Sequence, residues 1–258
     1  MRDGACVLEV KAVVQRFGSL TVLNKINMEF HRNEVVGIIG PNGAGKTTLF
    51  NVITGLYKPT EGSVWLDGEN VTGLQPYKVA RKGFARTFQN IRLFQNMTVL
   101  DNVIAGMYTQ GKSTLLDSLL HLSRKRKEDA RFEARAEELL TLMGLWDKRF
   151  ARAGDLPYGE QRRLEIARAM ATEPKLLLLD EPAAGMNEQE TLELSHVVRQ
   201  LKQMGYTILL IEHDMKFVMT TCEYIYVLNH GEQIAEGTPE KVTADPMVIE
   251  AYLGKEEE

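Results

Sequence analysis

The chain has 258 residues, of which 44% are hydrophobic, so it is long enough to bury a substantial core as one large domain or as two lobes. Its formal net charge of −4 lacks the overall basic field that is typical of nucleic-acid-binding proteins. The two cysteines, Cys6 and Cys222, fit neither a metal-ligand spacing nor a disulfide framework, which suits a reducing compartment. These numbers favour a globular protein of the cell interior that does not act on nucleic acid.

No segment of the sequence has the length of a membrane span. A helix needs roughly 20 apolar residues to cross a bilayer. The purest apolar runs, 176–179 and 208–211, have only the length of buried strands. The N-terminus also lacks the apolar core of a secretion signal. We therefore expect a soluble protein inside the cell, so that any role at a membrane comes through a partner.

The N-terminal part predicts a small antiparallel β layer. Residues 7–30 alternate polar and apolar side chains in several stretches, which is the period of strands with one solvated face. Residues 62–68 predict a further strand that ends in an Asp-Gly turn. Phe17, which precedes Gly18, is an aromatic residue of this layer, and residue type alone favours its packing in the core.

The strongest motif is a glycine-rich loop that fits the pattern G-x-x-x-x-G-K-[ST] of the phosphate-binding P-loop. It comprises Gly40, Pro41, Asn42, Gly43, Ala44, Gly45, Lys46 and Thr47. Residues 35–39 before it predict a short buried strand. The apolar residues after it recur at the spacing of one helix face: Leu49, Val52, Ile53 and Leu56. This strand–loop–helix context is the one that the motif requires.

The loop is suited to bind a nucleoside triphosphate. Its glycines let backbone N–H groups point toward one centre, and the N-terminus of the following helix adds partial positive charge. Lys46 would reach the β- and γ-phosphates, and the hydroxyl of Thr47 would be a ligand of Mg²⁺. With Thr48 included, residues 40–48 form the candidate phosphate site. A nucleoside triphosphate and Mg²⁺ are the expected cofactors, and the family resemblance described below implies that the nucleotide is ATP.

From Arg86 onward the pattern becomes mainly helical. Thr98, followed by Asp101, resembles the start of a helix. Two sets of apolar residues each share one helix face. They are Leu115, Leu119 and Leu122, and Phe132, Ala136, Leu139 and Met143. For the basic run 124–127 between them, contact with anionic lipid or nucleic acid is one interpretation, and an exposed helix start is the favoured one.

The second half of the chain alternates strands and helices. Runs 176–179, 207–211 and 224–228 predict buried strands, whereas 162–170 and 194–201 predict helices. Such alternation indicates right-handed crossovers and a mostly parallel sheet. In these sheets ligands bind at the carboxyl ends of the strands, which is where the polar residues of this chain are expected to gather.

Four polar residues complete a candidate hydrolytic site, and three of them, Asp180, Glu181 and His213, lie at expected strand ends. Asp180 ends an apolar run and would help to hold Mg²⁺, and Glu181 is placed to accept a proton from the attacking water. Gln89 would contact both Mg²⁺ and that water, and His213 would hydrogen-bond the γ-phosphate. Taken singly, a glutamine is usually a surface residue and a histidine is usually structural. Their joint order around a P-loop favours the catalytic interpretation.

The order of these motifs resembles that of an ABC-type ATPase over essentially the full chain: the P-loop, Gln89, the run 156–162, the run 179–182 and His213. A closer resemblance is to the ATP-binding subunits of bacterial branched-chain amino acid importers, particularly the longer of their two paralogous subunits. It rests on Arg86–Gln89, the run through Arg168, Leu179–Gly185, Ile211–Met215 and Ala251–Gly254.

The resemblance implies an α/β P-loop ABC ATPase fold with a mixed, mostly parallel core sheet, an antiparallel β layer and a helical signature subdomain. We expect a single ABC ATPase domain over residues 1–258. Within it, residues 1–89 and 164–258 would form the core with its β layer, and residues 90–163 would form the helical signature subdomain.

The resemblance also implies roles for the matching residues. Phe17 would stack on adenine, and Gln89 would connect the nucleotide site with the membrane subunit. Glu181 would be the general base and His213 the switch histidine. ATP would be enclosed between the P-loop of one chain and the segment 156–161 of a second ATPase chain, so a single chain would hydrolyse ATP poorly. The residues of that segment expected at the nucleotide are Pro157, Tyr158, Gly159 and Glu160.

Two kinds of partner follow from this resemblance. One is the second ATPase chain, either a paralogue or a second copy. The other is the set of membrane-spanning permease subunits, through which the protein would lie at the cytoplasmic face of the inner membrane. We expect these subunits to dock near Gln89 and Leu93–Phe94, where the two lobes meet.

Two positions depart from the general ABC pattern. Pro157 and Tyr158 stand where serine and glycine are usual, and proline offers neither a hydroxyl nor an N–H to a γ-phosphate. The amide of Gly159 and the following helix N-terminus are then the obvious donors. Asn187 stands where aspartate is usual and carries no negative charge. Because branched-chain importers pair two different subunits, unequal ATP sites fit that family.

Three alternative functions stay open. The first is transport of another substrate, such as urea, short amides or a lipid precursor. The second, a soluble ABC ATPase acting on nucleic acid or ribosomes, is disfavoured by the single P-loop and by the acidic charge balance. The third, a regulatory nucleotide-binding module without turnover, is disfavoured by Glu181 and His213 and mildly favoured by Pro157 and Asn187.

Overall fold

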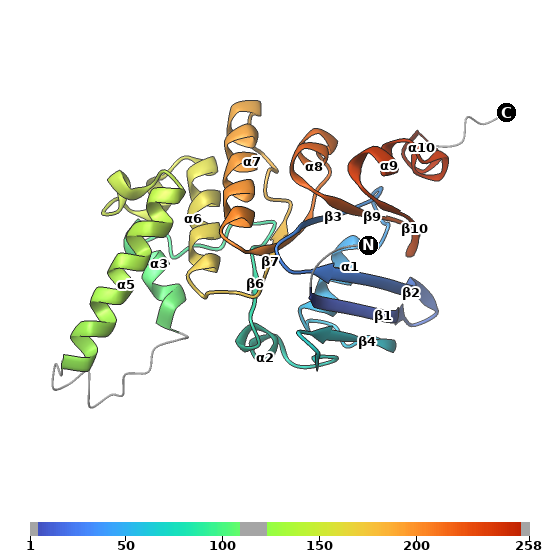
Figure 1. Ribbon diagram of the computed structural model, residues 1–258, viewed down its shortest axis with the longest axis horizontal. Coiled ribbons are helices and arrows are strands. Elements are labelled where there is room, and N and C mark those ends of the chain that lie inside the picture. Colours follow the sequence, from blue (N-terminus) through green and yellow to red (C-terminus); the bar gives the residue numbers. More distant parts are fainter. Residues whose placement is uncertain (1–4, 109–122, 254–258) are drawn as a thin grey trace.

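The computed structural model describes residues 5–108 and 123–253 and shows two sheets flanked by helices (Figure 1). The smaller sheet is antiparallel and lies beside α1, so the predicted β layer is confirmed. The predicted Asp-Gly turn joins its last two strands. In spatial order, the strands are β2 (Leu20–His31), β1 (Cys6–Phe17), β4 (Glu61–Leu66) and β5 (Glu69–Asn70).

Within the part of the chain that the structure describes, the larger sheet has six strands, and only β10 pairs antiparallel, with β9. In spatial order, these strands are β10 (Glu232–Gly237), β9 (Tyr224–Asn229), β3 (Val35–Ile39), β8 (Thr207–Ile211), β7 (Leu176–Asp180) and β6 (Phe84–Arg86). The predicted mixed, mostly parallel sheet is therefore confirmed. The sequence analysis did not predict β6 and β10.

Both faces of the larger sheet are buried, which explains the unbroken apolar runs of its strands. Side chains alternate between the faces of a strand. In β7, Leu177 and Leu179 pack toward the core that contains the helical lobe, while Leu176 and Leu178 pack toward the core that contains the antiparallel sheet. A strand with two buried faces needs an apolar residue at every position.

Helix α1 (Lys46–Ile53) packs its apolar face between the two sheets, as predicted for Leu49, Val52 and Ile53. The expectation for Leu56 was wrong, because the helix ends before it and its side chain is 51% exposed. The helix ends at Ile53 with Thr54 as its C-cap, and the next residue, Gly55, has a φ of 76°, a conformation that stops helices and favours glycine.

The helical lobe lies beyond β6 and β7, on the side of the molecule opposite β10 (Figure 1). It contains α3 (Val99–Met107), α5 (Ser123–Leu142) and α6 (Tyr158–Met170), with the 3₁₀ turns η2 (Trp146–Lys148) and η3 (Ala153–Asp155). Thr98 caps α3 by accepting a hydrogen bond from the N–H of Asp101, which confirms the predicted helix start. The second apolar set, Phe132, Ala136, Leu139 and Met143, is buried as predicted.

Some residues for which the sequence predicts a role lie outside the part of the chain that the structure describes. Leu115, Leu119 and Leu122 lie outside the described residues, as do Gly254 and residues 255–258. The basic run 124–127 lies in the first turns of α5, where Lys127 is exposed and the side chains of the other three are outside the description.

Helices α7 (Glu188–Gln203) and α8 (Met215–Thr221) pack on one face of the larger sheet. Further helices are α2 (Pro76–Arg81), α9 (Pro239–Thr243) and α10 (Pro246–Leu253). The predicted apolar stripe of α7, Leu194, Val197, Val198 and Leu201, is buried. Within residues 5–108 and 123–253, no helix combines the length and the apolar character of a membrane span.

Helix α7 begins with a reciprocal cap. The side chain of Asn187 accepts a hydrogen bond from the N–H of Glu190 at 2.9 Å, and the carboxylate of Glu190 accepts one from the N–H of Asn187 at 3.0 Å. This capping box satisfies two backbone donors that the helix itself leaves unpaired. The asparagine that departs from the family pattern therefore serves the fold as a helix cap.

Replacing Asn187 with alanine removes the acceptor of this cap. We expect the free energy of unfolding to fall by about 1 kcal/mol, measured by urea denaturation. Asn187→Ser keeps an acceptor at the same position and should stay within about 0.5 kcal/mol of wild type. An alanine variant as stable as wild type would show that the cap does not stabilise α7.

Candidate active site

The P-loop joins β3 to α1 and encloses the ammonium group of Lys46. Its Nζ donates hydrogen bonds to the carbonyl oxygens of Gly40 at 2.6 Å and Pro41 at 3.0 Å. Burial lowers the pKa of Lys46, and the negative charge of Glu181 opposes this shift. Gly40 has no space for a side chain, because a Cβ would lie 2.0 Å from the carbonyl oxygen of Leu228. This position requires glycine, as the motif predicts.

The structure brings Gln89, Glu181 and His213 together at one cavity beside the P-loop. Glu181 accepts a hydrogen bond from Nε2 of Gln89 at 2.8 Å, and its other carboxylate oxygen lies 2.8 Å from Nε2 of His213. The three residues follow β6, β7 and β8, parallel strands whose carboxyl ends share one edge of the sheet. The other lining residues are Val22, Asn42, Gly43, Ala44, Gly45, Lys46, Thr47 and Thr48.

The backbone of Glu181 is held in a conformation that is rare for residues other than glycine. Its φ is 48°, and its N–H donates to the carbonyl oxygen of Ile211 at 3.0 Å. Such backbone strain costs of order 1–3 kcal/mol and is found mainly where surrounding structure enforces it for function. Here it accompanies a carboxylate that two further side chains hold at the cavity.

Asp180 does not line this cavity and instead pairs with Arg86. The carboxylate accepts from Nη2 of Arg86 at 2.7 Å, and both side chains are largely buried. Arg86 also donates to Asn51 at 2.9 Å and to Thr54 at 3.2 Å, both from α1 and its C-terminal end. Arg86 therefore fixes the orientation of Asp180 and ties it to the P-loop helix. The sequence gives no local signal for this pair, whose members are 94 positions apart.

The donor atoms near the cavity fit Mg²⁺. Thr47 offers a hydroxyl and Gln89 an amide at the cavity, and the carboxylate of Asp180 lies one residue before Glu181. Oxygen donors suit Mg²⁺, which usually combines one or two carboxylates with water and substrate phosphates. Among the described residues, no three His, Cys, Asp or Glu side chains form a metal cage.

Phe17 lies at the end of β1, and its side chain is 44% exposed. Its ring meets that of Tyr57 edge-on, with the centroids 5.3 Å apart, and it does not line the P-loop cavity. Phe17 is thus not a core residue, and its ring has a solvent-exposed face. Val22 of β2, which does line the cavity, was not predicted from the sequence.

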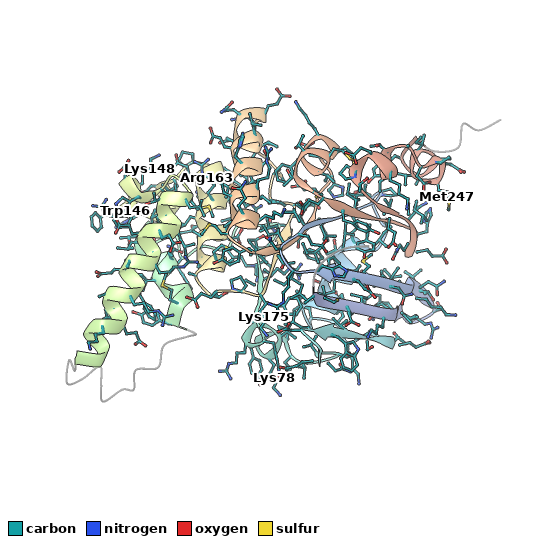
Figure 2. All side chains as sticks on the ribbon, viewed as in Figure 1. Lys78, Trp146, Lys148, Arg163, Lys175 and Met247 are labelled. Carbon is teal, nitrogen blue, oxygen red and sulfur yellow. The ribbon has the colours of Figure 1, made fainter. Side chains whose placement is uncertain are left out.

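The four residues expected to face the nucleotide of a second chain lie at the start of α6 and do not line the P-loop cavity of their own chain. Pro157 is the N-cap and offers no side-chain hydrogen bond, whereas Tyr158 is 44% exposed. Gly159 packs so closely on Glu190 that a Cβ would lie 2.6 Å from its carboxylate. Glu160 forms an ion pair with Lys148 at 2.6 Å, and Lys148 is labelled in Figure 2.

Glu212 is a buried acid that the sequence analysis did not single out. Its carboxylate accepts hydrogen bonds from the N–H of Ala183 at 2.7 Å and from the N–H of His213 at 3.1 Å. Burial raises the pKa of Glu212, and these backbone hydrogen bonds oppose the shift. Glu212 thereby connects the end of β8 with the loop after β7, on which Glu181 and its neighbours lie.

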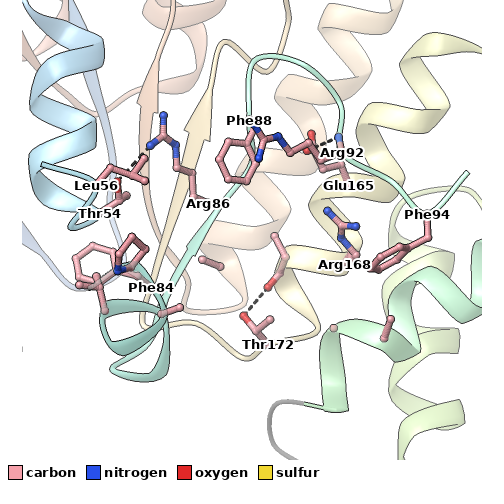
Figure 3. A pocket seen from close by; sticks show the side chains of 17 residues that line it. Thr54, Leu56, Phe84, Arg86, Phe88, Arg92, Phe94, Glu165, Arg168 and Thr172 are labelled. Atoms are coloured by element: carbon pink, nitrogen blue, oxygen red, sulfur yellow. Dashed lines mark hydrogen bonds between the residues drawn. The ribbon is translucent and has the colours of Figure 1, made fainter. Parts of the chain in front are cut away.

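A second cleft of about 560 Å³ lies between the core and the helical lobe (Figure 3). It is lined by residues of α2, β6, α3, α6 and the segment that follows β6. Two arginines lie over aromatic rings in its wall: Arg92 is 4.2 Å from the ring centre of Phe88, and Arg168 is 5.4 Å from that of Phe94. Burial lowers the pKa of Arg168.

Of the residues at which docking is expected, Phe94 lines this cleft. Gln89 lines the P-loop cavity instead, and Leu93 packs against the core. The segment after β6 therefore borders both the cleft and the P-loop cavity.

Comparison with known families agrees with this geometry. The model of the ABC transporter family matches residues 23–184, and the model of the branched-chain amino acid ATP-binding cassette transporter matches residues 232–258. The chain belongs to the ABC transporter family, whose ATP-binding domain hydrolyses ATP to power transport. The resemblance stated from the sequence motifs is confirmed.

Relatives match the chain over nearly its whole length. The high-affinity branched-chain amino acid transport ATP-binding protein LivG of Escherichia coli (strain K12) is 46% identical over 250 residues, which cover 96% of this chain and 98% of LivG. The corresponding protein BraF of Pseudomonas aeruginosa is 45% identical, with the same coverage.

Solved structures confirm the fold. An ATP-binding cassette of an ABC transporter in its ADP conformation is 34% identical to this chain, with a TM-score of 0.84. The match covers 97% of this chain and 100% of that cassette. A dimeric cassette in a post-hydrolysis state, bound to ADP and Pi, is 25% identical, with a TM-score of 0.75 over 90% of this chain and 98% of that chain.

The raised pKa of Glu212 predicts how stability depends on pH. Between the ordinary value of 4.5 and the higher folded-state pKa, the unfolded chain binds fewer protons at this residue than the folded chain does. The contribution of Glu212 to the free energy of unfolding is therefore fully present below pH 4.5 and falls as the pH rises through this window.

Urea denaturation of wild type and Glu212→Gln at several pH values tests this direction. The stability of wild type relative to the variant should be greatest below pH 4.5 and should decline above it. A relative stability that instead grows with pH would show that the ionised carboxylate is the form that the fold prefers.

Proposed function

We propose that the chain binds and hydrolyses ATP as the energising subunit of a membrane importer for branched-chain amino acids. The observation that carries the proposal is the position of Glu181, which Gln89 and His213 hold at the P-loop cavity. The substrate class is supported by LivG and BraF, whose names specify branched-chain amino acid transport. The family match at residues 232–258 supports the same class.

The residues at the cavity divide the work of phosphoryl transfer to water. The amides of the P-loop and the ammonium group of Lys46 neutralise the triphosphate. Glu181 accepts the proton of the attacking water, and Gln89 and His213 keep its carboxylate oriented. On nucleotide binding, His213 is free to turn toward the γ-phosphate, because its side chain is half-exposed.

Mg²⁺ would supply charge neutralisation at the β- and γ-phosphates. Thr47, Gln89 and Asp180 would hold it, since they provide a hydroxyl, an amide and a carboxylate. Arg86 already fixes the direction of the Asp180 carboxylate, so this group needs little reorganisation when the nucleotide arrives.

The ATP site of this chain needs a second ATPase chain to become complete. The start of α6 does not line the P-loop cavity of its own chain, and Tyr158 and Pro157 are exposed. We propose that this segment faces the nucleotide of the second chain, through the amide of Gly159 and the N-terminus of α6. The half-exposed ring of Phe17 would stack on adenine.

Glu181→Gln keeps the shape of the side chain and removes the base. We expect ATP hydrolysis to fall by at least about 100-fold while the affinity for ATP changes little, because the P-loop is untouched. Phosphate release and fluorescent-nucleotide binding measure the two quantities. The matched control is Glu188→Gln, which alters an exposed acid at the start of α7 that pairs with Lys216. Turnover by Glu181→Gln at the wild-type rate would exclude Glu181 as the base.

The cleft of Figure 3 is proposed as the docking site of the permease. It lies where the core and the helical lobe meet, and the segment that forms part of its wall continues to Gln89 at the P-loop cavity. A short helix of the permease that carries apolar residues and one acid would match the aromatic and arginine side chains of the wall. Its acid would face Arg168, whose burial favours a charged partner.

Arg168→Glu reverses the charge in this cleft. We expect co-purification with the membrane subunits to be lost, and nucleotide binding to the isolated chain to stay unchanged. Arg131→Glu is the control, because Arg131 lies on the exposed side of α5 and pairs with Glu173. Unchanged co-purification of Arg168→Glu would place the permease elsewhere on the chain.

This docking would hold the protein at the cytoplasmic face of the inner membrane. We propose that residues 90–163 act as the helical signature subdomain, with residues 1–89 and 164–258 as the core. Helix α6 runs across the expected boundary between them, so movement of this subdomain would be transmitted along one continuous helix.

A further inference from the structure

Arg162 of α6 has no exposed side-chain surface, and its guanidinium group contacts the backbone of the segment after β6. Nη1 donates to the carbonyl oxygen of Phe88 at 2.6 Å, and Nη2 donates to the carbonyl oxygen of Gln89 at 2.7 Å. The planar fork of an arginine is suited to hold two neighbouring acceptors at once. These contacts fix the backbone at Gln89 against the signature helix.

Glu165, one turn further along α6, completes a clamp. It accepts from Nη1 of Arg162 at 2.9 Å, and its second carboxylate oxygen accepts from the N–H of Arg92 at 3.1 Å. The Arg162–Glu165 clamp therefore fastens the segment 88–92 to α6 at both ends. Phe88, Arg92 and Glu165 also line the cleft between the lobes.

The Arg162–Glu165 clamp is also connected, through hydrogen bonds, with Tyr158 at the start of α6 and with Glu181 after β7. Nη2 of Arg162 lies 3.3 Å from the hydroxyl of Tyr158, in the segment expected at the second chain's nucleotide. The ring of Tyr158 in turn packs on Gly185, where a Cβ would be 3.3 Å from it. At the other end, the side chain of Gln89 donates to Glu181 at 2.8 Å. One buried arginine thus lies between the exposed Tyr158 and the carboxylate at the P-loop cavity.

Stability alone does not account for this pair. Desolvation of two buried charges often exceeds their attraction, and apolar pairs of similar volume are commonly as stable. Nε of Arg162 also has no hydrogen-bond partner among the described residues. The contacts that the pair does make are directed at one backbone segment, which indicates a geometric role.

We propose that Arg162 is a positioning residue for ATP hydrolysis. It holds the backbone of Gln89 so that the Gln89 side chain meets Glu181, and it links this position to Tyr158. This role rests on the proposed function, because the step that it serves is hydrolysis at Glu181.

The test uses the full chain with three variants. Arg162→Met combined with Glu165→Leu removes both charges together and leaves no unpaired charge in the core. Arg162→Lys keeps the charge but cannot hold two carbonyl groups with a planar fork. The control, Arg163→Gln, changes the neighbouring arginine (Figure 2), which pairs with Glu193 of α7 at 2.9 Å.

Amide hydrogen exchange and ATP turnover are the two readouts. In the double variant and in Arg162→Lys, we expect exchange in the segment 88–92 to rise at least about tenfold, while exchange in β3 and α1 stays unchanged. We expect kcat to fall at least about tenfold, with KM for ATP within about twofold of wild type, because only the position of Gln89 is altered. Arg163→Gln should match wild type in both.

Two results would overturn the proposal. If exchange in the segment 88–92 stays at the wild-type rate, Arg162 does not hold this segment. If exchange rises while kcat stays unchanged, the position of Gln89 does not matter for hydrolysis. If the double variant unfolds, Arg162→Lys carries the same expectations. Wild-type chain that binds ATP but does not hydrolyse it, either alone or after a paralogous chain is added, contradicts the proposed function instead. Hydrogen exchange in the segment 88–92 then still shows whether Arg162 holds this segment.

Discussion

Burial of both faces of the six-stranded sheet determines where polar side chains can lie. Because side chains on either face must be apolar, polar chemistry is confined to the ends of the strands. Parallel pairing then brings the ends of β3, β6, β7 and β8 to one edge. This edge brings together the P-loop, Gln89, Glu181 and His213. Gly40 and His213 are 173 positions apart in the sequence.

Buried charged groups organise this edge. Arg86 holds Asp180, Arg162 and Glu165 hold the backbone around Gln89, and Glu212 holds the loop after β7. Each of these groups costs desolvation energy, and each has its hydrogen bonds directed at a segment that borders the nucleotide cavity. The result is a set of loops whose positions are fixed before ATP arrives, which is the condition for electrostatic preorganisation.

Local patterns made much of the fold predictable. The P-loop, the strand that ends at Asp180 and the cap of α3 each have a signal within a few residues, so the sequence predicts them. Helix α1 was predicted to extend to Leu56, because apolar spacing continues beyond Gly55 and does not show where the backbone turns. The roles of Arg86, Arg162 and Glu212 were not predictable, since their partners are distant in sequence or are backbone atoms, which leave no trace in residue type.

The division of the ATP site between two chains is tested most directly by ATP turnover per chain as a function of chain concentration. If a second chain completes the site, turnover per chain rises with concentration in step with the dimer mass measured by light scattering, or begins only when a paralogous chain is added. Turnover per chain that stays constant on dilution, while light scattering shows only monomers, would contradict a site shared between two chains.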